Sequence, residues 1–167
     1  MIALLAMAAA IASSPRLGVA EGTCRPNESG PAIRITVEGL SHRTGTLRAE
    51  LYPVNDDDFL EDDNKLIAAG KAFRRSVAPV PAAGPVILCL RAPSPGAYAL
   101  AVIHNPSGGH GFSLLRDGVG FAGNPYLGHA KPHAIEAAIN VGQDVTPTLI
   151  VMNYRRGLFS FGPLGRR

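Results

Sequence analysis

Residues 32–52, AIRITVEGLSHRTGTLRAELY, decide the fold class of this chain. In residues 33–38 isoleucine and valine alternate with arginine, threonine and glutamate, and residues 47–51 repeat the alternation. A period of two is typical of strands whose sheet has one face in the core and one in water. Because the polar residues 41–45 between the two runs form a turn signal, we expect the two strands to form an antiparallel hairpin.

The rest of the chain repeats this pattern of short strands. Only residues 59–69 have helical spacing, enough for one short turn. The 167 residues suit one domain, and 19 glycines and 14 prolines favour short elements joined by turns. The sequence therefore predicts an all-β, single antiparallel β-sandwich of about seven strands with one long Gly-rich loop. Further strands are expected at residues 71–77, 85–91, 97–104, 134–141 and 146–154.

The N-terminus has the features of a secretory signal. The apolar run over residues 2–12 is as long as a signal h-region and shorter than the roughly 20 residues that cross a bilayer, although no Lys or Arg precedes it. Small residues in Gly18-Val19-Ala20 predict cleavage before Glu21, and Ala10-Ile11-Ala12 is a second candidate. We expect an exported protein, periplasmic or secreted, without a transmembrane segment. Its expected parts are a signal peptide at residues 1–20, an N-terminal segment at 21–32, the sandwich at 33–156, and a tail at 157–167 that either covers an edge strand or is loose.

Cys24 and Cys89 are the only two cysteines. In an oxidising compartment such a pair is normally joined, and no C-x-x-C motif suggests a redox thiol. We therefore expect a disulfide that closes a loop of about 65 residues, for which the chain-entropy description gives about 4 kcal/mol.

A family resemblance rests on motifs in the second half of the chain. Pro95-Gly96 and Tyr98-Ala99 precede an apolar strand that ends at His104. Gly120-Phe121-Ala122-Gly123-Asn124 and then Pro132 with Ile135-Glu136 follow in the same order. In these motifs, from about residue 33 to residue 154, the chain resembles the bacterial domain of unknown function family 2141. The resemblance implies an exported immunoglobulin-like or transthyretin-like β-sandwich with no established activity.

The loop after His104 departs from the pattern of that family. Relatives read His-Asp-x-Asn-x-Asn/Asp-Gly, whereas here the His is followed by Asn105-Pro106-Ser107-Gly108-Gly109-His110-Gly111. The carboxylate beside the His is gone, and only Asp117 is nearby. Because calcium takes six to eight oxygen ligands, a cation site in this loop would be weak or absent.

Two clusters could bind metal ions. An acidic loop has six carboxylates in eight positions, but it does not match an EF-hand, so we expect a solvated loop, with weak calcium binding as the alternative. Four histidines that could bind zinc or copper follow the central strand, and Pro132 disfavours the helix that would join the last two. For His104 a structural role, orienting the next loop through a hydrogen bond, is the simpler interpretation. The acidic loop is Asp56, Asp57, Asp58, Glu61, Asp62 and Asp63, and the histidines are His104, His110, His129 and His133.

Signs of catalysis or nucleic-acid binding are weak. Ser107 and Ser113 lie near histidines, but no Gly-x-Ser-x-Gly elbow exists, so no catalytic residue is assigned and a non-enzymatic role is favoured. The formal net charge of +3 is small, and the arginine pairs are more simply solvated chain ends. We therefore expect no nucleic-acid partner.

The long loop at residues 105–133 is the expected recognition surface. Its Gly-rich and partly apolar sequence exceeds the length of a simple turn. We expect a binding or structural module of the bacterial cell envelope, with no cofactor, whose partner is an unknown envelope protein or a small ligand. The alternatives are a metal-binding protein or metal-dependent enzyme, and a structural protein that docks by its edge strands or tail. The candidate ligand-binding residues are His104, Asn105, His110, Asp117, Phe121 and Asn124.

Overall fold

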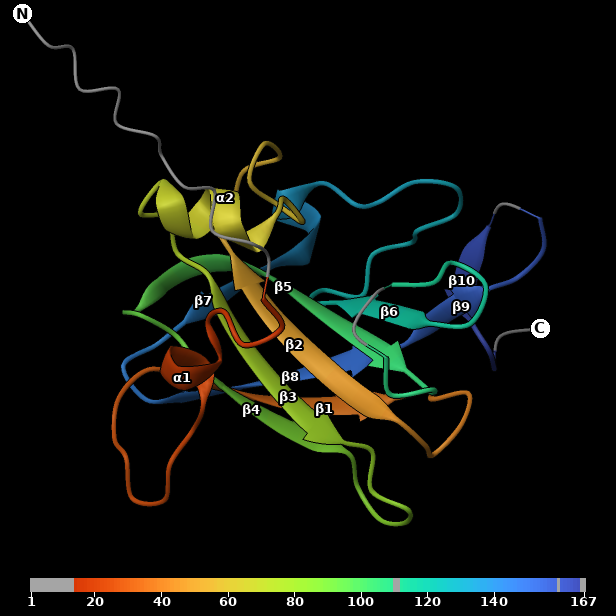
Figure 1. The fold of residues 1–167 in the computed structure, drawn as a ribbon, viewed down its shortest axis with the longest axis horizontal. Helices are drawn as coiled ribbons and strands as arrows, with labels where there is room; N and C mark the ends of the chain where they lie inside the picture. Colours follow the sequence, from red (N-terminus) through yellow and green to blue (C-terminus); the bar gives the residue numbers. More distant parts are fainter. Residues whose placement is uncertain (1–13, 110–111, 159, 166–167) are drawn as a thin grey trace, which may run out of the picture.

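A computed structural model of the chain describes residues 14–109, 112–158 and 160–165 (Figure 1). Its helical elements are short, and strands dominate. The elements are α1 (Val19–Gly22), β1 (Ala32–Glu38), β2 (Thr46–Tyr52), α2 (Asp63–Ala68), β3 (Arg74–Pro79), β4 (Ile87–Arg91), β5 (Gly96–Asn105), β6 (Gly118–Phe121), the 3₁₀ helix η1 (Ala134–Ala137), β7 (Ala138–Val141), β8 (Val145–Val151), β9 (Asn153–Arg155) and β10 (Phe161–Pro163).

The strands form two sheets. The smaller sheet has the order β4-β1-β8, and the larger has the order β10-β9-β6-β5-β2-β3, with β7 paired to β5. Figure 1 shows the smaller sheet lying behind β2, β3 and β5. Ile35 and Ile150 of the smaller sheet and Leu51 and Leu100 of the larger one share a single core and are fully buried. The all-β sandwich is therefore confirmed.

Pairing and strand number differ from the sequence expectation. β1 pairs antiparallel with β4 and parallel with β8, whereas β2 lies between β3 and β5, so the expected β1–β2 hairpin is wrong. The described residues contain ten strands rather than about seven, because the strand expected at residues 146–154 is divided into β8 and β9, and β6 and β10 are additional short strands. Of the strand expected at residues 134–141, the first half is η1. The expected short helical turn is present as α2.

A second hydrophobic cluster covers the outer face of the larger sheet. Tyr52, Phe59, Phe73 and Phe121 are buried there, and their rings meet edge to face at centroid distances of 5.4–5.8 Å. Such edge-to-face contacts stabilise aromatic clusters beyond the area that they bury. The loops before and after α2, together with residues 127–137, close over this face. The larger sheet is therefore packed on both sides, which explains the nearly continuous burial of β5.

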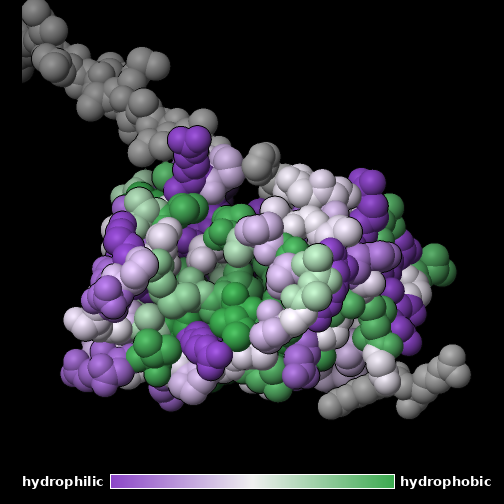
Figure 2. All heavy atoms as spheres, turned by 90° about the horizontal axis from the view of Figure 1, so that it is seen from below, coloured by the Kyte–Doolittle hydropathy of each residue, from purple (hydrophilic) through white to green (hydrophobic). Residues whose placement is uncertain are grey.

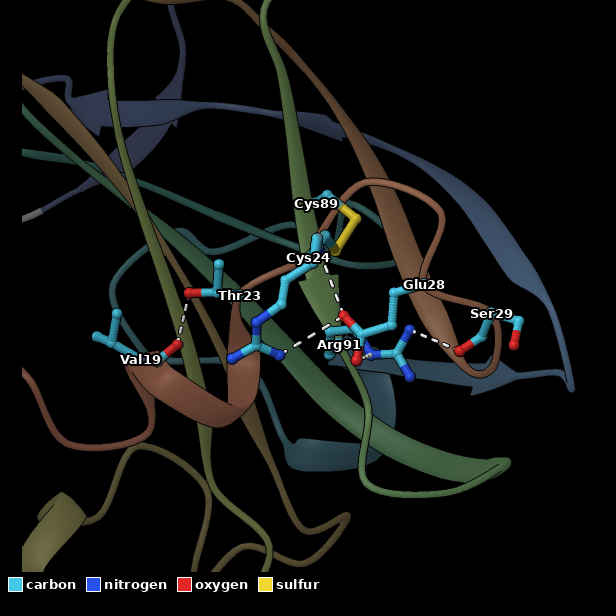
Figure 3. The surroundings of a disulfide bond; sticks show 8 residues. Val19, Thr23, Cys24, Glu28, Ser29, Cys89 and Arg91 are labelled. Atoms are coloured by element: carbon cyan, nitrogen blue, oxygen red, sulfur yellow. Dashed lines mark hydrogen bonds and ion pairs between the residues drawn. A yellow bond between two sulfur atoms is a disulfide. The ribbon is translucent and has the colours of Figure 1, made fainter.

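The expected disulfide is present. Cys24 and Cys89 are bonded, with their Cα atoms 5.9 Å apart (Figure 3). Near the disulfide, Glu28 lies 3.6 Å from Arg25 and 3.7 Å from Arg91, and Arg91 Nη1 donates to the Ser29 carbonyl at 3.0 Å. These contacts join the N-terminal segment to strand β4.

Exposed apolar residues occur on several sides of the protein. Figure 2 shows the lower side, where apolar residues gather in the middle and polar residues surround them. Val77 of β3 and Ile87 of β4 are 47% and 40% exposed. Because single exposed apolar residues are common, exposure alone does not identify a binding site. Within the described residues, no helix has the length and hydrophobicity needed to cross a membrane.

Candidate functional site

The predicted recognition loop contains a strand that sequence reasoning missed. β6 pairs with β5 on one side and with β9 on the other. A Cβ atom on Gly118 would lie 2.4 Å from the Tyr154 ring, and one on Gly120 would lie 2.4 Å from Ile150 Cγ2. These glycines allow β6 to lie flat against the core. The loop is thereby divided into two segments on either side of a rigid strand.

His104 is fully buried beneath the first of these segments. Its Nε2 lies 3.0 Å from the Thr44 carbonyl, which can only accept, so Nε2 carries the proton. Nδ1 therefore accepts from the Tyr154 hydroxyl at 2.6 Å, and that hydroxyl accepts from the Ser41 N–H at 3.1 Å. Burial lowers the pKa of His104 and raises that of Tyr154. Both ring nitrogens of His104 are hydrogen-bonded and the ring is neutral. His104 therefore connects β5 with β9 and with the turn at residues 41–45.

Asn105 and Asp117 shape the segment that follows His104. The Asn105 side-chain oxygen accepts the N–H groups of Ser107 and Gly109 at 3.0 and 3.1 Å. Asp117 is buried, accepts the Ser113 N–H at 2.7 Å and lies 3.4 Å from the Asn105 amide nitrogen. The structure thus brings these two predicted residues together with their side chains turned into the loop. His110 lies outside the described residues.

Phe121 and Asn124 occupy different environments. Phe121 is 3% exposed, and its ring packs edge to face on Phe59 at 5.8 Å. Asn124 has a positive φ of 48°, and its amide group bonds to the open edge of β8. It donates to the Leu149 carbonyl at 2.9 Å and accepts the Val151 N–H at 2.7 Å. Asn124 therefore caps a strand edge, whereas Phe121 supports the surface above the second cluster.

Most carboxylates of the acidic loop have partners within the protein. Asp56 accepts the Ala134 N–H at 2.7 Å, and Asp58, which is buried, pairs with Lys71. Hydrogen bonds to these donors lower the pKa values of both carboxyls. The loop is therefore not uniformly solvated. Of the others, Glu61 pairs with Lys65 at 3.1 Å, Asp62 caps α2 at 2.9 Å, Asp63 is buried 3.0 Å from Arg75, and Asp57 is exposed.

The described histidines do not form a common donor set. His133 is bonded through Nδ1 to Asp56 at 2.7 Å, and this hydrogen bond raises the pKa of His133. His129 lines a groove on the outer face of the larger sheet, and His104 is enclosed in the core. Across the described parts of the chain, no three His, Cys, Asp or Glu side chains come together as a metal site would require. Because His110 of the predicted histidine set lies outside the described residues, metal binding stays a prediction.

An apolar groove lies over the second cluster. This apolar groove has a volume of about 600 Å³. Leu115 and Leu158 on its sides are 69% and 75% exposed, and Leu114 is 63% exposed. Ligand sites are concave and mainly apolar, and large apolar side chains arranged around a hollow typically mark a binding surface. Its apolar lining is Leu60, Phe112, Leu114, Leu115, Val119, Phe121, Leu127, Ala130, Leu158 and Phe161.

The polar lining of the apolar groove is basic. Lys131 Nζ donates to the Phe59 carbonyl at 3.2 Å and lies 6.0 Å from the centre of the Phe59 ring. Arg155 donates to the carbonyls of Gly157 and Leu158 at 2.6 and 3.0 Å. His129 also lines the groove, and the described lining contains no Asp or Glu. These hydrogen bonds join both cations to neutral acceptors within the lining, and Lys131 also attracts the Asp56 carboxylate, which lies outside the lining.

A neighbouring polar hollow of about 570 Å³ shares Leu60, Phe112 and Val119 with the apolar groove. At its base Glu50 is buried and accepts from Tyr52 at 2.7 Å and from Arg75 Nε at 2.8 Å. Burial and the charge of Glu50 raise the pKa of Tyr52. Sequence reasoning missed this cluster, because Glu50 takes the polar place in the alternation of β2. Because these buried charges are already paired with one another, the apolar groove is the better candidate for binding.

Comparison with known proteins gives one family match. The family model described as an uncharacterized protein conserved in bacteria (DUF2141) matches residues 35–148, from within β1 to within β8. No curated protein and no solved structure matches the chain. The matched range includes Lys131 and most of the apolar lining, and it ends before Arg155 and Leu158.

Proposed function

Because this chain belongs to the bacterial DUF2141 family, whose description assigns no activity, we propose its function from its own geometry: it is an exported β-sandwich that binds a ligand through an apolar surface. The proposed binding site is the apolar groove. The main support for it is that exposed leucines surround a hollow of about 600 Å³. Transferring apolar area out of water contributes roughly 25 cal/mol per Å², so a ligand that covers these leucines gains affinity.

Export is part of this proposal. The apolar run at residues 2–12 has the length of a signal h-region, and the disulfide fits a protein that folds in an oxidising compartment. We place the protein in the bacterial cell envelope or outside the cell. There it would take up a small ligand or an apolar segment of an envelope partner.

Docking by strand addition has less support. Asn124 occupies the β8 edge at Leu149 and Val151, and Pro147 interrupts the N–H groups of the same strand. The disulfide joins the N-terminal segment to β4, the other edge strand of the smaller sheet. Because blocked or proline-containing edges resist pairing, the apolar groove is the stronger docking surface.

Titration with the neutral fluorescent probe N-phenyl-1-naphthylamine tests the groove. We expect saturable binding, and we expect Leu158→Ser to weaken it about fivefold to tenfold, because a leucine side chain is lost from the groove wall. Ile135→Ser is the matched control, since Ile135 is 73% exposed and lies outside the groove lining. Absence of saturable binding, or equal loss in both variants, would refute the proposed site.

A further inference from the structure

The charges around the apolar groove indicate the ligand that it accepts. Lys131 and Arg155 line it, and its described lining contains no carboxylate. An uncharged apolar ligand would gain no affinity from two cations in the groove lining. An anionic head group beside the two cations would replace part of their contact with water by favourable Coulomb attraction.

Strand pairing places the two cations on segments that flank β10. Arg155 of β9 lies directly opposite Phe161 of β10, so both side chains leave the sheet on the same face. Gly128 forms a bridge with Phe161 on the other side, and its carbonyl accepts the Phe161 N–H at 2.8 Å. The segment that carries Lys131 is therefore a neighbour of β10, and β10 lies between the two cations.

The polar hollow next to the apolar groove has acidic side chains. The polar hollow that shares Leu60, Phe112 and Val119 with the apolar groove is also lined by Glu61 and Asp62. An anion at that end would meet these acidic side chains, whereas the lining beside Lys131 contains none, and Asp56, which Lys131 attracts, lies outside it. The distribution of charge therefore sets one orientation, with the head group at the basic side and the chain over the leucines.

We propose that the ligand is a single-chain fatty acid anion, with its carboxylate beside Lys131 and Arg155 and its acyl chain over Phe112, Leu115 and Leu158. This inference rests on the proposed function, since it requires that the groove binds a ligand. The groove volume of about 600 Å³ falls within the range of small-molecule sites.

Three ligands with the same twelve-carbon chain test the charge: dodecanoate, 1-dodecanol and dodecylamine. Each competes with N-phenyl-1-naphthylamine on the full chain at pH 8 and below its micellar concentration. We expect dodecanoate to bind about tenfold more tightly than 1-dodecanol, and dodecylamine to bind most weakly, because partly exposed ion pairs each contribute modestly.

Charge-matched variants locate the head group. Lys131→Gln should reduce the preference for dodecanoate severalfold and leave 1-dodecanol binding unchanged. Arg155→Gln should act in the same direction. Arg34→Gln is the control. It removes the same charge, but Arg34 is exposed on β1 in the smaller sheet, away from the groove lining. A preference that survives both groove variants would overturn the assignment of the head group.

The outcomes separate this inference from the proposed function. Equal affinities for dodecanoate and 1-dodecanol, with the probe still bound, would overturn the fatty acid inference and leave the binding groove in place. Failure of the probe and of all three ligands would overturn both. Sedimentation tests a further case, in which the protein is a dimer that binds no ligand and that dodecanoate does not dissociate. This result would assign the groove to a second copy of the chain and would overturn both the proposed function and the fatty acid inference.

Discussion

At the scale of single residues, the His104–Tyr154 pair explains how a polar side chain is accommodated in the core. Tyr154→Phe removes the hydroxyl that donates to His104 Nδ1 and accepts from the Ser41 N–H. We expect the free energy of unfolding to fall by about 1–3 kcal/mol, because a buried acceptor loses its partner. Urea denaturation measures the change. Tyr126→Phe is the control, since Tyr126 is 91% exposed, and equal stabilities of the two variants would contradict the role of the pair.

A second prediction at this scale concerns pH. The hydrogen bond to Asp56 raises the pKa of His133 and lowers that of Asp56. The contribution of His133 to stability is therefore fully present below its unfolded pKa and is lost as pH rises through the raised pKa. The contribution of Asp56 is present above its unfolded pKa and is lost as pH falls through the lowered pKa. Asp56→Asn should bring the pKa of His133, measured by NMR titration, down towards about 6.5. An unchanged titration would show that Asp56 is not the cause.

At the scale of elements, residues 14–22 belong to the folded domain. The Gly18 carbonyl accepts the Arg75 N–H at 2.9 Å, and the buried Arg75 guanidinium donates to the Ser14 and Leu17 carbonyls at 3.1 and 3.4 Å. Cleavage before Glu21 would remove all three acceptors. Of the two signal sites that the sequence offers, Ala10-Ile11-Ala12 preserves these contacts.

For the proposed export, we therefore expect the mature chain to begin at Ser13, which intact mass spectrometry would establish. The free energy of unfolding should be about 1–3 kcal/mol lower for a chain that begins at Glu21 than for one that begins at Ser13, because buried donors on Arg75 lose their partners. Removing the C-terminal Arg166 and Arg167 instead is the control for trimming a chain end. Equal denaturation curves for the two N-termini would mean that this segment contributes nothing to stability.

At the scale of the whole molecule, the disulfide joins two segments with a sequence separation of 65 residues. The double substitution Cys24→Ser and Cys89→Ser should lower the free energy of unfolding by about 2–4 kcal/mol, since the unfolded chain regains the entropy that the loop had lost. Denaturation with and without a reductant checks this. The wild type should lose stability on reduction and the double variant should not. An identical response of the two proteins would contradict the prediction.

Local sequence patterns were enough to predict the all-β class, the disulfide and most of the strands, but not the short strands β6 and β10. Alternation over two residues is a local signal, and two cysteines leave only one pairing. The candidate site was predicted in part: the loop at residues 105–133 does provide Phe112, Leu115 and Lys131. Of the chosen ligand-binding residues, however, His104, Asn105 and Asp117 hold the loop from inside.

Strand pairing and the position of the apolar groove follow from tertiary packing and were not predictable from the sequence. β1 and β2 have similar alternation, yet they belong to different sheets, because pairing depends on contacts between residues far apart in sequence. The groove needs Leu60, the loop around Leu115, and Leu158 of the tail on one face. Local patterns specify which side of a strand is apolar, but packing between distant segments decides which apolar side chains remain uncovered.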